Sequence, residues 1–186
     1  MRRLDIDLIH SAIIFATNAH KGQLRKGTDL PYIIHPMEVM QILCEMEADE
    51  VLKIAGVLHD TLEDTDTTEE EIEKLFGEKV LRLVKSNSEN KTLSWQERKQ
   101  HTIDELKTAP LDVQMLILAD KLSNMKSLLA DYTNQGEDLW KRFNAPKEKQ
   151  KWYYGGVIEA LENLSNVKSC KENYQKMKTI YHQIFE

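Results

Sequence analysis

Apolar residues recur at helical spacing along almost the whole chain. Between residues 5 and 19, for example, Leu8, Ala12, Phe15, Ala16 and Ala19 fall on one stripe, which is typical of a helix with one buried face. The same periodicity predicts further helices at about 36–43, 49–60, 69–76, 78–85, 94–107, 110–132, 146–164 and 168–185. No stretch shows period-two alternation bounded by turn signals. The pattern therefore predicts an all-α fold, a single helical bundle of about eight to ten helices.

Local start and stop signals support these boundaries. Pro36 suits the first turn of the second helix, and Asp49 can cap the third, because proline needs no amide partner there and a short carboxylate accepts from free backbone amides. Ser94 and Glu97 have the spacing of a capping box, and Gly77 is a typical helix terminator. The segment from residue 21 to 32, rich in Gly, Lys and Asp, reads as a turn.

Length and composition suit one globular domain. The chain has 186 residues, 41% of them hydrophobic and 30% charged, and shows no repeat or low-complexity linker. We expect one domain over residues 1–186, with a core at about 6–164 and a C-terminal helix at about 168–185. No apolar run approaches the roughly 18 residues of a membrane span, and the N-terminus lacks a cleavable signal pattern. Cys44 and Cys170 fit no CxxC motif, which predicts reduced thiols in a cytoplasmic protein.

The net charge of −6 argues against a nucleic-acid partner, although it leaves a small phosphorylated substrate open. Two basic clusters interrupt the acidic background. The first lies just before His35, and its members are Lys21, Arg25 and Lys26. The second is either a solvated helix face or a phosphate contact, and it contains Lys141, Arg142, Lys147, Lys149 and Lys151. The adjacent Trp152-Tyr153-Tyr154 is either a buried aromatic patch or a pocket wall.

A candidate metal site centres on the adjacent pair His59-Asp60, at the end of an apolar helix. His35 upstream and Asp120 downstream could complete it. Two imidazoles and two carboxylates form a ligand set for a divalent metal held by nitrogen and oxygen. The combination carries the prediction, since a single His-Asp dipeptide occurs by chance in many chains.

Asp120 lies in a segment that is apolar on nearly every side, residues 113–119. Such a helix is usually buried, and a buried carboxylate is costly without a cationic partner. Lys121 is expected to point about 100° away around the helix and to be a poor direct partner. A bound metal would satisfy Asp120, and the alternative is a carboxylate that caps a nearby helix or pairs with a distant arginine.

Glu63 and Asp64 form a second layer beside the metal candidates. Glu63 follows His59 by four residues, and Asp64 follows Asp60 by four. On one helix, residues four apart share a face. The two carboxylates would then lie one turn from the ligands, where they could orient water or take its proton.

Four motifs together resemble the HD-domain hydrolases, and specifically the hydrolase domain of RelA/SpoT enzymes and the stand-alone small alarmone hydrolases. The resemblance covers roughly residues 6–164. The motifs are residues 19–27 (AHKGQLRKG), 31–36 (PYIIHP), 59–64 (HDTLED) and 118–125 (LADKLSNM).

This resemblance implies an all-helical HD fold around one divalent ion, typically manganese. The ligands that match the family are His35, His59, Asp60 and Asp120, and the pair that matches its catalytic acids is Glu63 and Asp64. In that family the reaction removes pyrophosphate from the 3′ position of guanosine tetra- or pentaphosphate.

The resemblance also implies nucleotide contacts. Arg25 and Lys26 match the segment that packs on the base, while Tyr32 and Asn124 match pocket-lining positions. Lys21 joins them as the nearest other basic side chain, suited to balance phosphate charge. Two positions depart from the family pattern: Lys121 stands where arginine is usual, and Ser123 where histidine is usual.

The sequence therefore predicts a metal-dependent phosphohydrolase of a nucleotide, with the 3′-diphosphate of ppGpp as its leading substrate. One alternative keeps the chemistry and changes the substrate, for example to NADPH losing its 2′-phosphate. Another is a metal-stabilised nucleotide sensor without turnover. An intact Glu63-Asp64 pair favours an enzyme, since a binding module needs no water-orienting carboxylates. The sequence does not indicate the oligomeric state.

Overall fold

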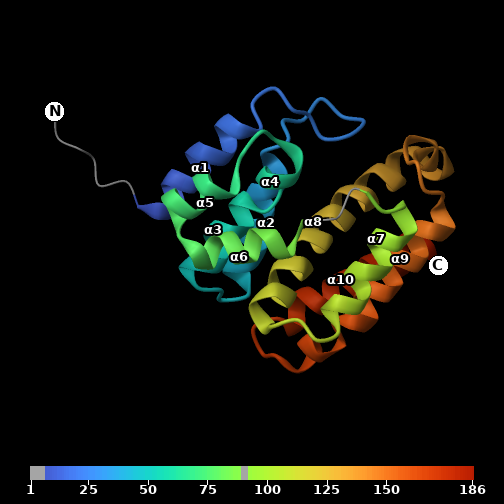
Figure 1. Ribbon diagram of the computed structural model, residues 1–186. Helices are drawn as coiled ribbons and strands as arrows, with labels where there is room; N and C mark the ends of the chain where they lie inside the picture. The colour runs from blue at the N-terminus through green and yellow to red at the C-terminus, as the bar shows by residue number, and fades with distance from the viewer. Residues whose placement is uncertain (1–6, 89–91) are drawn as a thin grey trace. The chain divides into compact units, whose positions relative to one another are not determined.

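The computed structural model describes residues 7–88 and 92–186, and within them the chain is helical (Figure 1). These residues form ten α-helices, α1 to α10, and two 3₁₀ helices, η1 and η2. The only β-pairing among them is an isolated bridge between Leu24 and Pro31. The predicted all-α fold is therefore confirmed.

The backbone divides into two compact units, residues 1–88 and 89–186, which are described separately. The expectation that they make up one HD domain stays a prediction. Nowhere in 7–88 or 92–186 is a helix both long and apolar enough to cross a membrane. Both cysteines are free thiols; Cys44 is exposed and Cys170 is buried.

In the first unit, α3 is the central helix. The helices are α1 (Leu8–Ala19), α2 (Ile34–Glu45), α3 (Glu50–Leu58), α4 (Thr61–Asp64), α5 (Glu69–Phe76) and α6 (Glu78–Ser86). Helix α3 packs against α1, α2 and α6, and α5 packs against α6. Ile54, Ala55, Val57 and Leu58 are almost wholly buried, so α3 is enclosed on most sides. The first predicted helix began at about residue 5, and its first two residues lie outside the described range.

Gly56 lets α2 and α3 approach closely. A Cβ atom at this position would lie 2.5 Å from Leu43 Cδ1 and 3.4 Å from Val39 Cγ1. Real Cβ atoms do not come so near to another atom, so a larger residue would force the buried Leu43 side chain to move within the packed contact. This contact matters for the site because His35 is carried by α2 and His59 directly follows α3.

The predicted caps of this unit are present. Asp49 accepts a hydrogen bond from the Leu52 amide (2.8 Å) at the start of α3. Gly77 ends α5 with a φ of +89°, a conformation that residues with a Cβ rarely adopt. Pro36 lies in the first turn of α2, as expected.

The chain bends at His59-Asp60, between α3 and α4, whereas Glu63 and Asp64 were expected one turn further along the same helix as His59-Asp60. Helix α3 ends at Leu58 and α4 begins at Thr61, whose hydroxyl donates to the Leu58 carbonyl (2.7 Å). His59 and Asp60 keep right-handed helical angles, and the Asp64 amide still donates to the Asp60 carbonyl (2.9 Å). The one-turn spacing from residue 60 to 64 therefore survives the bend.

Residues 21–32 form a narrow loop, called here the basic loop. The amide of Tyr32 donates to the Gln23 carbonyl (2.9 Å), and the Arg25 amide donates to the Leu30 carbonyl (2.8 Å). These two bonds close the base of the loop around the Leu24–Pro31 bridge. The tip then carries Lys26 to Asp29.

The second unit is built on the long helix α8. Its elements are α7 (Trp95–Leu106), α8 (Leu111–Gln135), η1 (Gly136–Arg142), α9 (Lys147–Ala160), η2 (Glu162–Asn166) and α10 (Lys171–Phe185). Helix α10 packs against α8 and α9, and α9 packs against α7. The predicted capping box of Ser94 and Glu97 is present, and Pro110 directly precedes α8. The sequence pattern did not predict η1.

Candidate metal centre

His59 is buried and held in one tautomer. Its side chain is fully inaccessible to solvent, and its Nδ1 lies 2.8 Å from the carbonyl oxygen of Gly56. Because a carbonyl oxygen can only accept, Nδ1 must carry the proton. A neutral His59 therefore presents the lone pair of Nε2, the state in which histidine binds a metal.

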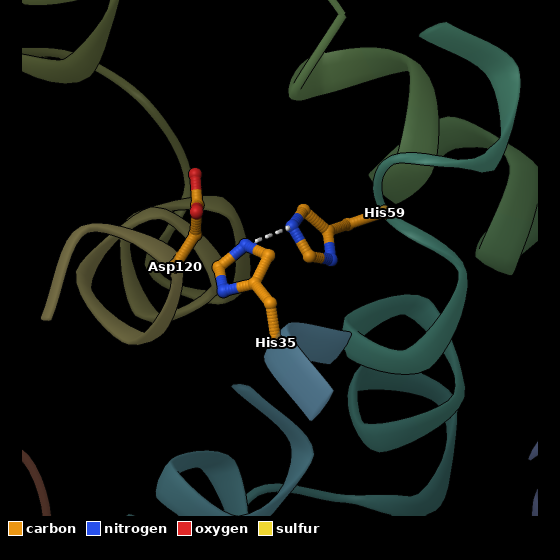
Figure 2. A group of neighbouring side chains, drawn as sticks. All are labelled: His35, His59 and Asp120. Carbon is orange, nitrogen blue, oxygen red and sulfur yellow. Dashed lines mark hydrogen bonds between the residues drawn. The ribbon is translucent and has the colours of Figure 1, made fainter. Parts of the chain in front are cut away.

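The lone pairs of three side chains meet at this nitrogen. His35 Nε2 lies 3.2 Å from His59 Nε2, and a dashed line in Figure 2 joins these two nitrogens. Asp60 Oδ2 lies 3.0 Å from His59 Nε2 and 3.5 Å from His35 Nε2. Converging lone pairs repel each other unless a proton or a cation lies among them. The donor set of two imidazoles and a carboxylate fits a divalent ion of the nitrogen- and oxygen-binding kind.

Tyr32 fixes the Asp60 carboxylate. Its hydroxyl donates to Asp60 Oδ2 at 2.6 Å and lies 3.5 Å from Asp64 Oδ2. Both carboxylates therefore lie on the same side of the bend, as the spacing of four residues predicted. Tyr32 was expected to line a nucleotide pocket; in the structure its hydroxyl is committed to Asp60, and its ring lies edge-on to His35 at 6.0 Å between centroids.

The two proposed catalytic acids lie on α4. Glu63 is half-buried and Asp64 is exposed. Asp64 is thus accessible to a substrate in water while its carboxylate remains beside the Tyr32 hydroxyl.

The basic loop brings one of its cations to this group of residues. The guanidinium carbon of Arg25 lies 5.7 Å from the centroid of the Tyr32 ring, within the range of a cation–π contact. Lys21 and Lys26 are exposed. The basic loop therefore places the Arg25 guanidinium against Tyr32, whose hydroxyl binds Asp60.

In the second unit, Asp120 is buried on α8 and contacts Lys121 and Asn124. Lys121 Nζ lies 2.6 Å from Asp120 Oδ2, and the Asn124 amide donates to Asp120 Oδ1 at 2.6 Å. The expectation that Lys121 would be a poor partner is wrong. The angle around the helix describes where Cβ points, and four methylene groups allow the ammonium to fold back.

Burial alone would lower the pKa of Lys121, but the nearby Asp120 charge holds that pKa well above its ordinary value. Asp120 therefore has a cationic partner within its own helix, so its burial by itself does not require a metal. Figure 2 labels Asp120 with His35 and His59, three buried residues of the kinds that hold metal ions.

The later basic cluster is largely ion-paired within the second unit. Lys141 pairs with Asp138 (2.6 Å) and Lys147 with Glu137 (2.6 Å). Arg142 pairs with Asp131. These pairs favour the interpretation of a structural, partly solvated surface over that of a phosphate contact.

The aromatic triad divides between the two interpretations given for it. Tyr153 and Tyr154 are buried, with ring contacts to Trp95 and Phe185 respectively, so they belong to the core. Trp152 is 37% exposed and lines a groove along α9 of about 890 Å³.

Two residues of the first motif, His20 and Gln23, were given no role in the sequence analysis. In the structure, His20 Nδ1 lies 2.8 Å from Gln23 Oε1, and Gln23 Nε2 donates to the Asp64 carbonyl at 2.7 Å. The sequence feature that could have pointed to these two residues is their position in the first motif, His20 just before the basic loop and Gln23 near its start. No sequence pattern links Gln23 to a residue 41 positions later.

Comparisons with known proteins show the family of this chain. The family described as HD domain matches residues 12–148. A GTP pyrophosphokinase of Myxococcus xanthus is 38% identical over 133 residues, which cover 67% of this chain and 17% of that protein. The mouse guanosine-3′,5′-bis(diphosphate) 3′-pyrophosphohydrolase MESH1 is 41% identical over 117 residues, which cover 61% of this chain and 65% of that protein.

A solved structure resembles nearly the whole chain. It is described as a metazoan ortholog of SpoT that hydrolyzes ppGpp; it superposes with a TM-score of 0.77 at 28% identity and covers 98% of both chains. The chain thus spans about a sixth of the length of the bacterial pyrophosphokinase and about two thirds of MESH1.

Proposed function

We propose, from the premise that this chain belongs to the HD domain family, that it is a metal-dependent phosphohydrolase of a nucleotide. Its most specific assignment is guanosine-3′,5′-bis(diphosphate) 3′-pyrophosphohydrolase, the activity named for MESH1. The observation that carries the proposal is the convergence of His35 Nε2, His59 Nε2 and Asp60 Oδ2 beside Asp64. Such a donor group next to an accessible carboxylate suits hydrolysis of a phosphate ester.

The ligands that we propose are His35, His59 and Asp60 from the first unit and Asp120 from the second, and the metal that we propose is manganese. A divalent ion held there would acidify water and neutralise charge on phosphoryl oxygens. The protein prepares the first three donors itself. Gly56 fixes the tautomer of His59, and Tyr32 fixes the orientation of Asp60.

The carboxylates of α4 then carry the proton transfer. A water molecule attacks the 3′-α phosphorus in line, a new P–O bond forms, and the bond from that phosphorus to the ribose 3′ oxygen breaks, with the departing oxygen taking up a proton from solvent. Asp64 or Glu63 orients the water and accepts the proton that it loses. With ppGpp and cleavage at the ribose 3′ oxygen, the products are GDP and pyrophosphate.

Charge on the substrate is balanced by the basic loop. Arg25, next to the Tyr32 ring, would lie against the nucleotide base, while Lys21 and Lys26 would approach the phosphates. We also propose that Asn124 lines the pocket. A small phosphorylated nucleotide is then the partner of this chain; the absence of a nucleic-acid partner and a cytoplasmic location remain predictions from charge and cysteine pattern.

The test is product analysis by anion-exchange chromatography. Manganese-loaded protein is incubated in parallel with ppGpp, NADPH and GTP. Release of GDP and pyrophosphate from ppGpp alone is expected. Turnover of NADPH without ppGpp hydrolysis would keep the phosphohydrolase chemistry and overturn the alarmone assignment. Binding of a nucleotide with no turnover of any of the three would favour a sensor.

A further inference from the structure

His20 and Gln23 form a hydrogen-bonded bridge to the carboxylate helix. Gln23 Nε2 lies 2.7 Å from the Asp64 carbonyl oxygen, which can only accept, so this end of the amide must be the NH₂ group. The other end, Oε1, then accepts from His20 Nδ1 at 2.8 Å. The bridge therefore has one direction: His20 donates to Gln23, and Gln23 donates to Asp64.

Burial and ring packing hold His20 in place, so it can fix the position of the Gln23 side chain. It is 97% buried at the end of α1, and its ring lies on that of Tyr32 with 4.8 Å between centroids. Its Nε2 is buried and has no hydrogen-bond partner among the residues that the structure describes. Leaving a buried nitrogen unpaired is costly, so packing and the Nδ1 bond must hold the ring in place.

Gln23 acts at a weak point of α4. Asp64 is the last residue of this four-residue helix, and Thr65 after it is extended. The final carbonyls of a helix have no partner within it, and so short a helix has little stability of its own. The Gln23 side-chain amide supplies the missing hydrogen-bond donor for the Asp64 carbonyl.

The base of the basic loop is thus joined to Asp64 twice. Gln23 and Tyr32 face each other across the loop base, since the Tyr32 amide donates to the Gln23 carbonyl. The Gln23 side chain holds the Asp64 backbone, while the Tyr32 hydroxyl lies beside the Asp64 carboxylate and donates to Asp60. One residue of the loop base therefore holds the backbone of Asp64, and the residue opposite it lies beside the Asp64 carboxylate.

We infer that His20 and Gln23 are positioning residues for the hydrolytic reaction, and that they act by fixing the backbone of Asp64. This inference rests on the proposed function. The first motif then has a second function besides balancing the charge of the substrate. Its residue Gln23 fixes the backbone of Asp64, which lies 41 residues later in the chain.

The test replaces the bridge without changing size. Gln23→Met removes both hydrogen bonds, and Gln41→Met makes the same change at an exposed site of α2 as a control. His20→Leu removes the donor to Gln23, whereas His20→Asn keeps a donor near the Nδ1 position. Steady-state kinetics with ppGpp, manganese content, and amide hydrogen exchange of residues 60–65 are measured for each.

For Gln23→Met and His20→Leu, kcat is expected to fall about tenfold, because small misplacements of reacting groups cost this much or more. KM should change less than about twofold, manganese content should be unchanged, and exchange at residues 60–65 should accelerate. His20→Asn should regain most of the lost kcat, and Gln41→Met should match the wild type. An unchanged kcat in Gln23→Met, or a loss confined to KM or to manganese content, would overturn the inference.

Hydrogen exchange separates this inference from the function on which it rests. If the wild type hydrolyses none of the nucleotides, the proposed function fails. Faster exchange at residues 60–65 in Gln23→Met would still establish the bridge to Asp64. Exchange equal to that of the wild type would refute the bridge, whatever the activity.

Discussion

Replacing Lys121 with methionine tests whether Asp120 is a metal ligand. Asp120 is 97% buried and its ammonium partner lies at 2.6 Å. Removing one member of a buried ion pair costs about 3–5 kcal/mol, because the remaining charge is left without compensation. The hydrogen bond from Asn124 persists, so we expect the lower end, about 3 kcal/mol. For a chain of this length that is a fall in Tm of about 6–12 °C.

Manganese should reverse most of this loss. If the ion binds Asp120, it supplies the positive charge that Lys121 no longer provides. In the wild type, the ammonium 2.6 Å from the same carboxylate repels the ion. Manganese should therefore raise the Tm of Lys121→Met more than that of the wild type, and calorimetric titration should show at least about tenfold tighter binding, or about 1.4 kcal/mol.

Lys107→Met is the matched control. Lys107 pairs with Asp104 in the same unit, but both side chains are more than half exposed, and such pairs contribute about 1 kcal/mol or less. Its response to manganese should equal that of the wild type. An equal manganese response in the wild type and in Lys121→Met would show that ion and ammonium do not compete for Asp120, and the ligand assignment would then be wrong.

Three further outcomes are expected. Glu63→Gln combined with Asp64→Asn should lower kcat at least about 100-fold, as for the loss of general acid–base groups, with manganese content unchanged by elemental analysis; full activity would exclude their proposed role. His59→Ala should lose the ion, because no other residue can supply its Nε2 lone pair, and wild-type metal content in this variant would refute the site. Burial raises the pKa values of the Cys170 thiol and the Tyr174 hydroxyl. The folded state thus favours the neutral forms of both groups. Their contribution to the free energy of unfolding is fully present below the unfolded-state pKa values and is lost as pH rises through the folded-state values. The urea midpoint of the wild type should therefore decrease in alkaline solution, and that of Cys170→Ala should decrease less steeply.

Local signals predicted the helices well because they act within a few residues. The Asp49 cap, the Ser94–Glu97 capping box and the Gly77 terminator depend only on neighbouring backbone groups, and all three are present. The bend at His59-Asp60 was not predicted, because the four-residue spacing to Glu63 and Asp64 fits an unbroken helix, and both residues at the bend do keep helical angles. Only the change in hydrogen bonding, with Thr61 donating to the Leu58 carbonyl, marks it.

The candidate site was predicted in its residue types and only partly in its contacts. Adjacent donors such as His59 and Asp60 can be found from spacing, since the chain itself keeps them together. The bonds of Tyr32 to Asp60 and of Gln23 to Asp64 span 28 and 41 residues, so they depend on tertiary packing. The prediction that Lys121 is a poor partner of Asp120 was wrong for another reason. A helical projection describes the direction of Cβ and not the reach of a long side chain.

Because the base of the basic loop is closed by hydrogen bonds, substitutions at the base and substitutions at the tip should have different consequences. Residues at the base, Gln23 and Tyr32, are hydrogen-bonded to Asp64 and Asp60, so under the proposed function substitutions there should alter the reaction itself. Residues at the tip, from Lys26 to Asp29, lie beyond the bond between Arg25 and Leu30. Tips of such loops tolerate substitution and insertion. Under the proposed function, substrate preference can therefore diversify at the tip while the proposed catalytic residues stay unchanged, and loop grafting at residues 26–29 is a route to new specificities.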